Sequence, residues 1–303
     1  MSRILKKEVV ENVNVYEASI KRFNYLFDNF DTVVVSFSGG KDSTVCLNLA
    51  LQVAKEKNKL PLNVYFWDEE AIQPETIDYV ERVRQNPDVK MKWICLPIKH
   101  RNACSRQEPY WYCWDPSKKD KWVRPMPDNP DVVTEMKAFK WGDSVPELAE
   151  YVYGPEFGTV ADVRGIRADE SLRRYRSVAQ RTRDNWIGGA RNNHNYPCSP
   201  IYDWTTFDVW TAPRKFGWDY NRSYDIMNMM GQMPSDQRVC PPYGEEPLSG
   251  LWIYAQGWPD MWHKMINRVH GASTAGKYAI TELYGFGKLK VPDGKTWREW
   301  TYD

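Results

Sequence analysis

The fold of this chain is decided by Ser38-Gly39-Gly40-Lys41-Asp42-Ser43, which follows an apolar run at 32–37 and precedes a helix-like stretch at 43–56. The β-branched run predicts a strand, and apolar residues at helical spacing predict a helix after the glycines. Two glycines let the backbone turn sharply and direct several N–H groups at one anion, to which the helix start adds its positive dipole end. The stretch therefore predicts a phosphate-binding loop between a strand and a helix.

This loop lacks the spacing of the Walker A motif, which places four residues between its first glycine and the Gly-Lys pair. It resembles the loop of the PP-loop or ATP pyrophosphatase superfamily, whose Ser-Gly-Gly-x-Asp-Ser motif holds the pyrophosphate end of ATP. The resemblance implies a cradle for the leaving pyrophosphate made of Ser38, Gly39, Gly40 and Ser43. It also implies that Lys41 adds charge and that Asp42 caps the helix or meets the hydration shell of a magnesium ion. The alternative is an ordinary Gly-Gly turn followed by a helix cap.

Four apolar runs are predicted to form strands, at 32–37, 62–67, 91–96 and 159–164, and an amphipathic helix is predicted at 13–30. Strands that alternate with helices predict an α/β fold with a parallel sheet and helices on both faces. Together with the resemblance, this implies an adenine nucleotide alpha hydrolase-like core. Ligands of such sheets bind beyond the carboxyl ends of the strands. Asp68 follows the second run, so we expect it near the nucleotide.

A second motif, at 165–171, follows the fourth predicted strand and reads Gly-Ile-Arg-Ala-Asp-Glu-Ser. Gly165 allows the backbone to approach a ligand closely, and Arg167 has the fork geometry that binds anions. We expect Arg167 to face the anionic acceptor or the α-phosphate. The alternative is that the two acidic residues cap a helix and that the arginines at 173–176 coat a solvated face.

A third motif contains Pro200-Ile201-Tyr202-Asp203-Trp204, with Asp208-Val209-Trp210 following. The three motifs in this order, across about residues 30–212, resemble phosphoadenylyl-sulfate (PAPS) reductases and sulfate adenylyltransferase small subunits. The segments at 217–221 and 238–244 are similar to PAPS-reductase-domain proteins of the IbrA type, which occur in bacteria and phages. That resemblance implies a ParB-like protein partner.

The domain organisation follows from these motifs. We expect an N-terminal helical segment at 1–30, a PP-loop nucleotide-binding domain at 31–212 and a mainly helical, Trp-rich extension at 213–303. The stretch at 97–142 breaks the strand-helix rhythm with prolines and tryptophans, which predicts an ordered insertion over the edge of the sheet.

The chain departs from the reductases at its cysteines. PAPS reductases carry a C-terminal Glu-Cys-Gly-hydrophobic-His segment. This chain has no such segment, and its nearest candidate, Cys240, lies in Val-Cys-Pro-Pro-Tyr. The spacing of His100, Cys104 and Cys113 matches no strong zinc template, so we predict no metal site. Cys198 has no assigned role.

The composition of the chain limits which partners and which location we expect. The formal net charge of +1 over 303 residues gives no bulk attraction to nucleic acid or membrane, and neither end carries a signal peptide or a long apolar span. We expect a cytoplasmic protein that binds an adenine nucleotide, ATP with Mg²⁺ or alternatively PAPS. Our main hypothesis is an adenylyltransferase with Lys41 and Arg167 as catalytic residues. The alternatives are a regulatory nucleotide-binding subunit and a PAPS reductase that uses Cys240.

Overall fold

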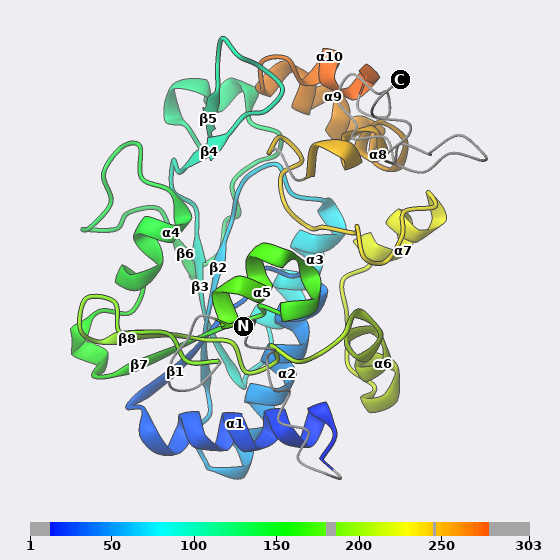
Figure 1. Ribbon diagram of the computed structural model, residues 1–303. Helices are drawn as coiled ribbons and strands as arrows, with labels where there is room; N and C mark the ends of the chain where they lie inside the picture. Colours follow the sequence, from blue (N-terminus) through cyan, green and yellow to red (C-terminus); the bar gives the residue numbers. More distant parts are fainter. Residues whose placement is uncertain (1–12, 180–185, 245–246, 279–303) are drawn as a thin grey trace, which may run out of the picture.

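The computed structural model describes residues 13–179, 186–244 and 247–278 (Figure 1). Its helices are α1 (Val15–Asn29), α2 (Lys41–Glu56), α3 (Pro74–Arg84), α4 (Val145–Leu148), α5 (Leu172–Ala179), α6 (Thr206–Phe216), α7 (Ser223–Met229), α8 (Leu251–Gly257), α9 (Pro259–Arg268) and α10 (Ala272–Tyr278). Its strands are β1 (Thr32–Ser36), β2 (Leu62–Trp67), β3 (Val89–Ile94), β4 (Lys99–Arg101), β5 (Tyr110–Tyr112), β6 (Val132–Val133), β7 (Val160–Arg164) and β8 (Asn195–Cys198).

Six strands form one parallel sheet in the order β6-β3-β2-β1-β7-β8, while β4 and β5 pair separately as an antiparallel ribbon. The predicted α/β class and the four predicted strands are confirmed. Sequence reasoning misses β6 and β8 for different reasons. β6 has only two residues, and β8 contains Asn195 and Pro197, which are poor strand formers. The parallel sheet thus extends by one short strand at each side.

The sheet is covered on both faces, as its continuous apolar strands require. Val34 and Val35 of β1 are fully buried. Figure 1 shows α2 and α3 on the right of the sheet and α4 on its left. Tyr153, which follows α4 in the chain, packs against the sheet with its ring 6.5 Å from that of Tyr65 in β2. The N-terminal helix predicted at 13–30 is confirmed as α1, which begins where Asn14 Oδ1 accepts a hydrogen bond from the Glu17 N–H.

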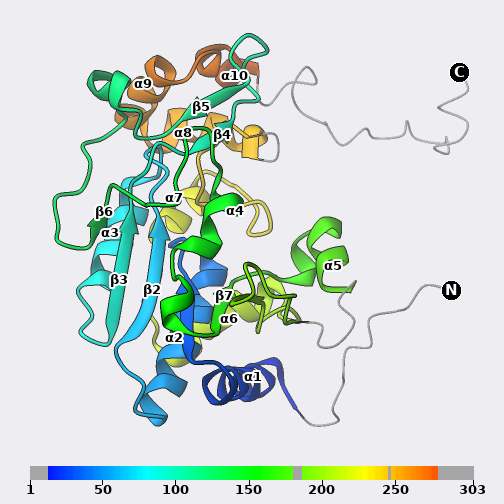
Figure 2. The same cartoon turned by 90° about the vertical axis from the view of Figure 1, so that its left-hand side faces the viewer.

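The chain after β8 is helical over its described residues, which confirms the predicted character of the extension. Figures 1 and 2 show α8, α9 and α10 gathered beside β4 and β5 at one end of the molecule. Arg268 of α9 donates two hydrogen bonds to the carboxylate of Glu70, at 2.7 and 3.0 Å, just after β2. The extension therefore packs over the carboxyl end of the sheet. None of the described helices has the length and apolarity needed to cross a bilayer.

Candidate functional site

The phosphate loop and the motif at 165–171 lie side by side at the carboxyl edge of the sheet. β1 pairs with β7 in register from Thr32 opposite Val160 to Ser36 opposite Arg164. From β1 the chain passes to β2 on one side, and it later reaches β7 on the other side. Open α/β sheets bind ligands at such a reversal of strand order, because the two outgoing loops separate there. Two of the three sequence motifs thus meet at the expected binding position.

The geometry of the loop explains both glycines. Gly39 has φ +69°, and a Cβ there would lie 2.9 Å from a threonine methyl of α3. Gly40 is the N-cap of α2 and provides no side-chain cap, and a Cβ there would lie 3.1 Å from Val239 Cγ2. The Ser38 N–H donates to Ser43 Oγ at 3.2 Å, and the two hydroxyl oxygens are 3.1 Å apart. The loop is therefore compact, and the hydroxyl groups of Ser38 and Ser43 are in contact with each other.

Lys41 is held by the C-terminal extension. Its backbone N–H donates to the Tyr224 hydroxyl at 2.9 Å, and its ammonium donates to the Gln237 carbonyl at 3.0 Å. The side chain is buried, and this burial lowers the pKa of Lys41, while the nearby Asp42 carboxylate acts in the opposite direction. In this conformation, two donors of the phosphate loop already have protein acceptors.

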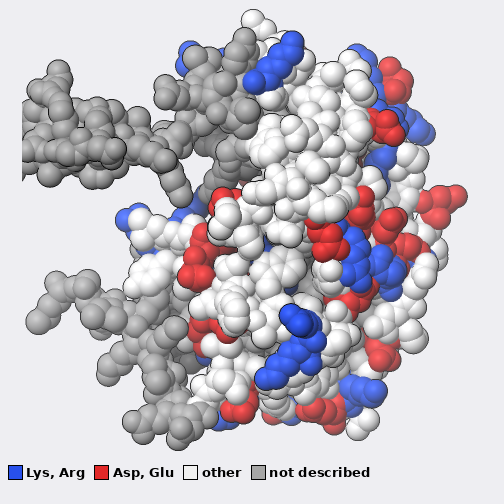
Figure 3. All heavy atoms as spheres, turned by 90° about the vertical axis from the view of Figure 1, so that its right-hand side faces the viewer, with Lys and Arg blue, Asp and Glu red and all other residues white. Residues whose placement is uncertain are grey.

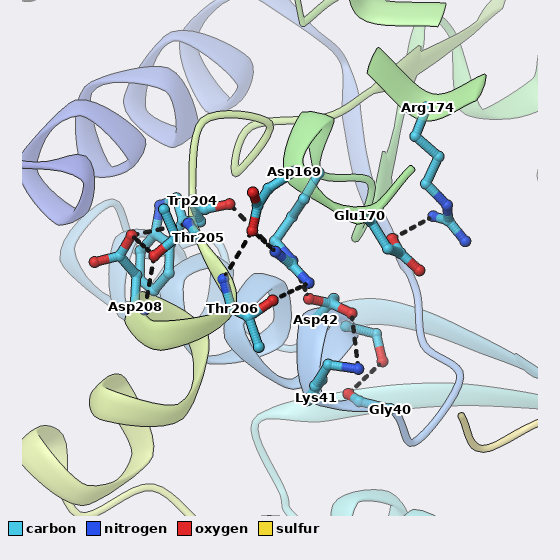
Figure 4. A network of polar contacts seen from close by, with 12 residues as sticks. Gly40, Lys41, Asp42, Asp169, Glu170, Arg174, Trp204, Thr205, Thr206 and Asp208 are labelled. Carbon is cyan, nitrogen blue, oxygen red and sulfur yellow. Dashed lines mark hydrogen bonds and ion pairs between the residues drawn. The ribbon is translucent and has the colours of Figure 1, made fainter. Parts of the chain in front are cut away.

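Arg167 is enclosed between the first and third motifs. Its Nε pairs with the carboxylate of Asp42, its Nη1 donates to the Trp204 carbonyl at 3.3 Å and its Nη2 to Thr206 Oγ1 at 3.5 Å. Figure 4 shows Asp42 and Thr206 approaching this point from α2 and α6. The side chain is 1% exposed. A Cβ on Gly165 would lie 2.8 Å from the backbone of Asp42, so the two motifs are in direct contact.

Arg238 is a site residue that sequence reasoning misses. Its guanidinium pairs with Glu170, which also contacts Arg174 at 3.1 Å. The Arg238 side chain is 33% exposed and lines a cavity of about 270 Å³ together with Ser171 and Cys240. The two chain neighbours of Arg238 touch the phosphate loop: the Gln237 carbonyl accepts from Lys41, and Val239 Cγ2 would lie 3.1 Å from a Cβ on Gly40. No local pattern identifies Arg238, because Glu170 lies 68 positions away.

Asp68 follows β2 as predicted, but its carboxylate is fully buried in a polar network. Its Oδ2 accepts from Trp93 Nε1 at 2.7 Å, and its Oδ1 pairs with Arg124 and accepts from the Glu70 N–H. Arg124 comes from the predicted insertion at 97–142, which therefore reaches the edge of the sheet. Contact between Asp68 and a nucleotide stays a prediction.

The cysteines and histidines of the insertion do not gather around a metal position. Within 13–179, 186–244 and 247–278, no group of three or more His, Cys, Asp or Glu side chains is arranged to hold a metal ion. Cys113 Sγ lies 3.5 Å from His100 Nε2. Burial raises the pKa of the Cys113 thiol and lowers the pKa of His100 to about 4. Both groups are therefore neutral at ordinary pH. Cys240 is half-buried, whereas the other five cysteines are buried.

The family of the chain is settled by residues 32–227, which match the model of the phosphoadenosine phosphosulfate reductase domain. The chain belongs to this family. The match covers all three motifs and confirms the resemblance noted from the sequence. A second family model, Domain of unknown function (DUF3440), matches residues 231–302. The family therefore accounts for the sheet and its loops, and the DUF3440 match begins at the segment that reaches Lys41.

Relatives of this reductase-domain protein include one curated sequence. The chain is 34% identical over 306 residues to the uncharacterized protein YbdN of Escherichia coli strain K12, covering 95% of this chain and 74% of YbdN. Solved structures that are similar include Candida glabrata FMN adenylyltransferase with FAD and pyrophosphate, at 13% identity and a TM-score of 0.44 over 72% of this chain and 64% of that one. Candida auris PAPS reductase is similar at 17% identity and a TM-score of 0.40, over 73% of this chain and 87% of the reductase chain.

Proposed function

We propose that this chain binds ATP with magnesium at the phosphate loop and transfers the adenylyl group to an anionic acceptor, releasing pyrophosphate. One observation carries the proposal: the loop after β1 and the motif after β7 meet at the reversal of strand order and are joined by the Arg167–Asp42 ion pair. Membership of the reductase-domain family supports an adenine nucleotide as the ligand. In this chemistry the protein mainly positions phosphates and stabilises developing charge.

In this proposal Arg167 and Arg238 have different roles. Arg167, predicted to face the acceptor or the α-phosphate, would have to leave Asp42 to do so, and breaking a buried ion pair is costly. We therefore assign Arg167 to holding the first turn of α2 against the β7 loop. Arg238 is one third exposed, and only its Nη1 is paired with Glu170, so its other N–H groups can meet the anion without breaking that pair. Ser38, Gly39, Gly40 and Ser43 keep the predicted role of cradling pyrophosphate.

In this proposal magnesium binds together with ATP, through its phosphate groups. Mg²⁺ keeps several waters and is usually bound through substrate phosphates and one or two carboxylates. The carboxylates nearest the loop are engaged, since Asp42 pairs with Arg167 and Glu170 pairs with Arg238 and Arg174. The phosphate oxygens and water would therefore supply most of its ligands.

Labelled nucleotide tests the proposal directly. Purified protein with magnesium and α-labelled ATP, with and without sulfate-like acceptors, should release pyrophosphate and form AMP or an adenylylated product. Lys41→Ala should abolish this release, and Lys264→Ala, at an exposed helix position, should leave it unchanged. Equal release by the two variants would contradict the assignment of the loop.

A regulatory nucleotide-binding subunit is the second candidate. It is favoured by the contacts of Tyr224 and Gln237 with Lys41, because they link occupancy of the loop to the extension. In this scheme the chain binds ATP or PAPS and reports it to a protein partner, for which the sequence resemblance suggests a ParB-like protein. Saturable ATP binding without any cleavage would favour it over the adenylyltransferase.

A third candidate is a sulfonucleotide reductase. It is favoured by the place of Cys240, half-buried in the cavity that Arg238 also lines. A nearby cation favours the thiolate that such chemistry requires. Thioredoxin-dependent release of sulfite from PAPS that disappears in Cys240→Ser would support it, and no sulfite release would exclude it.

A further inference from the structure

A second, larger cavity lies between α6 and α7 and adjoins the cavity that Arg238 lines, since Gln237 lines the one and Arg238 the other. Its volume is about 770 Å³, within the range of small-molecule sites. Aromatic residues dominate its lining: Phe207, Trp210, Trp218, Tyr220 and Tyr224. Figure 3 views this side of the molecule, and the middle of the face is largely uncharged with charged side chains around it. The cavity therefore offers several rings within one hollow.

The rings are held in fixed orientations rather than collapsed on one another. Trp210 meets Tyr224 edge to face, with centroids 4.9 Å apart and an interplanar angle of 85°. Trp218 stacks by one face on Phe216, at 5.0 Å and 28°. Edge contacts leave ring faces available, on which a planar aromatic ligand can stack. This lining suits a flat aromatic molecule better than a flexible aliphatic one.

The polar groups of the cavity favour a negative charge on that ligand. Arg214 is exposed and has no ion-pair partner among the described residues, whereas the Asp225 carboxylate accepts a hydrogen bond from the Tyr220 hydroxyl at 3.0 Å. The indole N–H of Trp210 also lacks a hydrogen-bond partner within the described parts of the chain, but it is buried and does not face the open cavity. Arg214 is therefore the donor that a negative group on the ligand would meet.

The cavity also shares walls with the phosphate loop. Tyr224 and Gln237 line the cavity, and both accept hydrogen bonds from Lys41. Thr206, a third wall residue, accepts a hydrogen bond from Arg167. A molecule in the cavity would therefore lie directly behind groups that hold the loop.

We propose that the cavity between α6 and α7 is a binding site for a small planar aromatic anion, distinct from the nucleotide position at the phosphate loop. The ring stacks among Trp210, Trp218 and Tyr220, and the negative charge faces Arg214. This proposal does not depend on the proposed function, because the cavity binds its ligand without nucleotide.

Anilinonaphthalene sulfonate, a fluorescent aromatic anion, is a suitable probe for titration of the full chain without nucleotide. We expect one saturable site that Trp210→Ala weakens by about tenfold, since a lost stacked ring costs about 1.4 kcal/mol. Arg214→Gln should weaken binding by about threefold, as expected for loss of an exposed charge pair. Phe207→Ser is the second variant for the rings, because this side chain is 78% exposed and its loss does not threaten folding.

The matched control is Met229→Ser, which removes an apolar side chain of α7 that is 71% exposed and outside the cavity lining. It should bind the probe like the unchanged protein. An equal loss in Met229→Ser, or no loss in Phe207→Ser and Arg214→Gln, would overturn the proposal by showing general surface binding. Displacement of the probe by ATP would also overturn it, because the cavity would then be part of the nucleotide site.

Discussion

The Tyr224 hydroxyl oxygen lies 2.9 Å from the backbone nitrogen of Lys41 and accepts its hydrogen bond. This contact joins α7 of the extension to the first residue of α2, where we propose that a phosphate group of the nucleotide binds. Tyr224 is buried, and burial raises the pKa of its hydroxyl, so it stays neutral at ordinary pH. The Lys41 N–H is therefore satisfied by a protein hydroxyl, at the position that we propose for a phosphate oxygen of the nucleotide.

Replacing Tyr224 tests this exchange. Tyr224→Phe leaves the buried Lys41 N–H without an acceptor in the free protein, which should cost about 1–3 kcal/mol of stability. A bound phosphate oxygen restores the bond, so ATP affinity should rise by about fivefold while the melting temperature falls. Isothermal titration and thermal melts measure the two effects. Tyr220→Phe, whose hydroxyl bonds Asp225, should not tighten ATP binding, and weaker binding in Tyr224→Phe would show that the hydroxyl contacts the nucleotide.

The Arg167–Asp42 pair should behave as a coupled structural unit. Arg167→Met leaves the Asp42 carboxylate without its buried partner and should lower the free energy of unfolding by about 3–5 kcal/mol. The double variant with Asp42→Asn should lose clearly less than the sum of the single variants. Denaturant unfolding of all four proteins gives the coupling energy. Arg173→Met, at an exposed position of α5, is the control, and additive losses would contradict the pairing.

Gly165 tests the contact between the two loops. A Cβ at this position would lie 2.8 Å from backbone atoms of Asp42 and Ser43, so Gly165→Ala must push the start of α2 away. We expect a loss of about 1–3 kcal/mol in stability together with weaker ATP binding. Gly189→Ala is the matched control, because nothing lies within 4 Å of the Cβ that it adds. Equal ATP affinity in the two variants would contradict the role of this contact.

Glu69 should make stability depend on pH. Burial, and then the Asp68 charge, raise the pKa of Glu69 from 4.5 to about 7. Between these values the folded protein keeps the proton that the unfolded chain releases, so rising pH destabilises the fold through this group. The stability of Glu69→Gln relative to the unchanged protein should therefore increase from pH 4.5 to about 7 and then level off.

Unfolding curves across this range measure that difference. His100 lies 3.5 Å from Glu69, and its lowered pKa gives the opposite slope. Because groups this close titrate together, both proteins are compared with the substitution His100→Asn, so that they differ in Glu69 alone. A relative stability that stays flat with pH would show that the carboxyl titrates at its ordinary value.

The local parts of the site could be predicted from the sequence. The strand, the turn with two glycines and the helix lie within 32–56, and their residue types restrict φ, hydrogen bonding and packing over a few positions. The parallel sheet followed for the same reason, since alternating apolar runs and helices permit few arrangements. β6 and β8 were not predicted, because a short or polar strand forms only where a neighbouring strand pairs with it.

The sequence by itself therefore determined the class of fold and the loop with two glycines between β1 and α2. Only the tertiary structure decided which side chains hold that loop. Lys41 bonds Tyr224 across 183 positions, and Arg167 meets Asp42 across 125. A charged or hydroxyl side chain can pair with many partners, and its identity carries no record of the distant one. The choice is made when the extension packs over the sheet, because burial then requires each polar group to find an acceptor or donor.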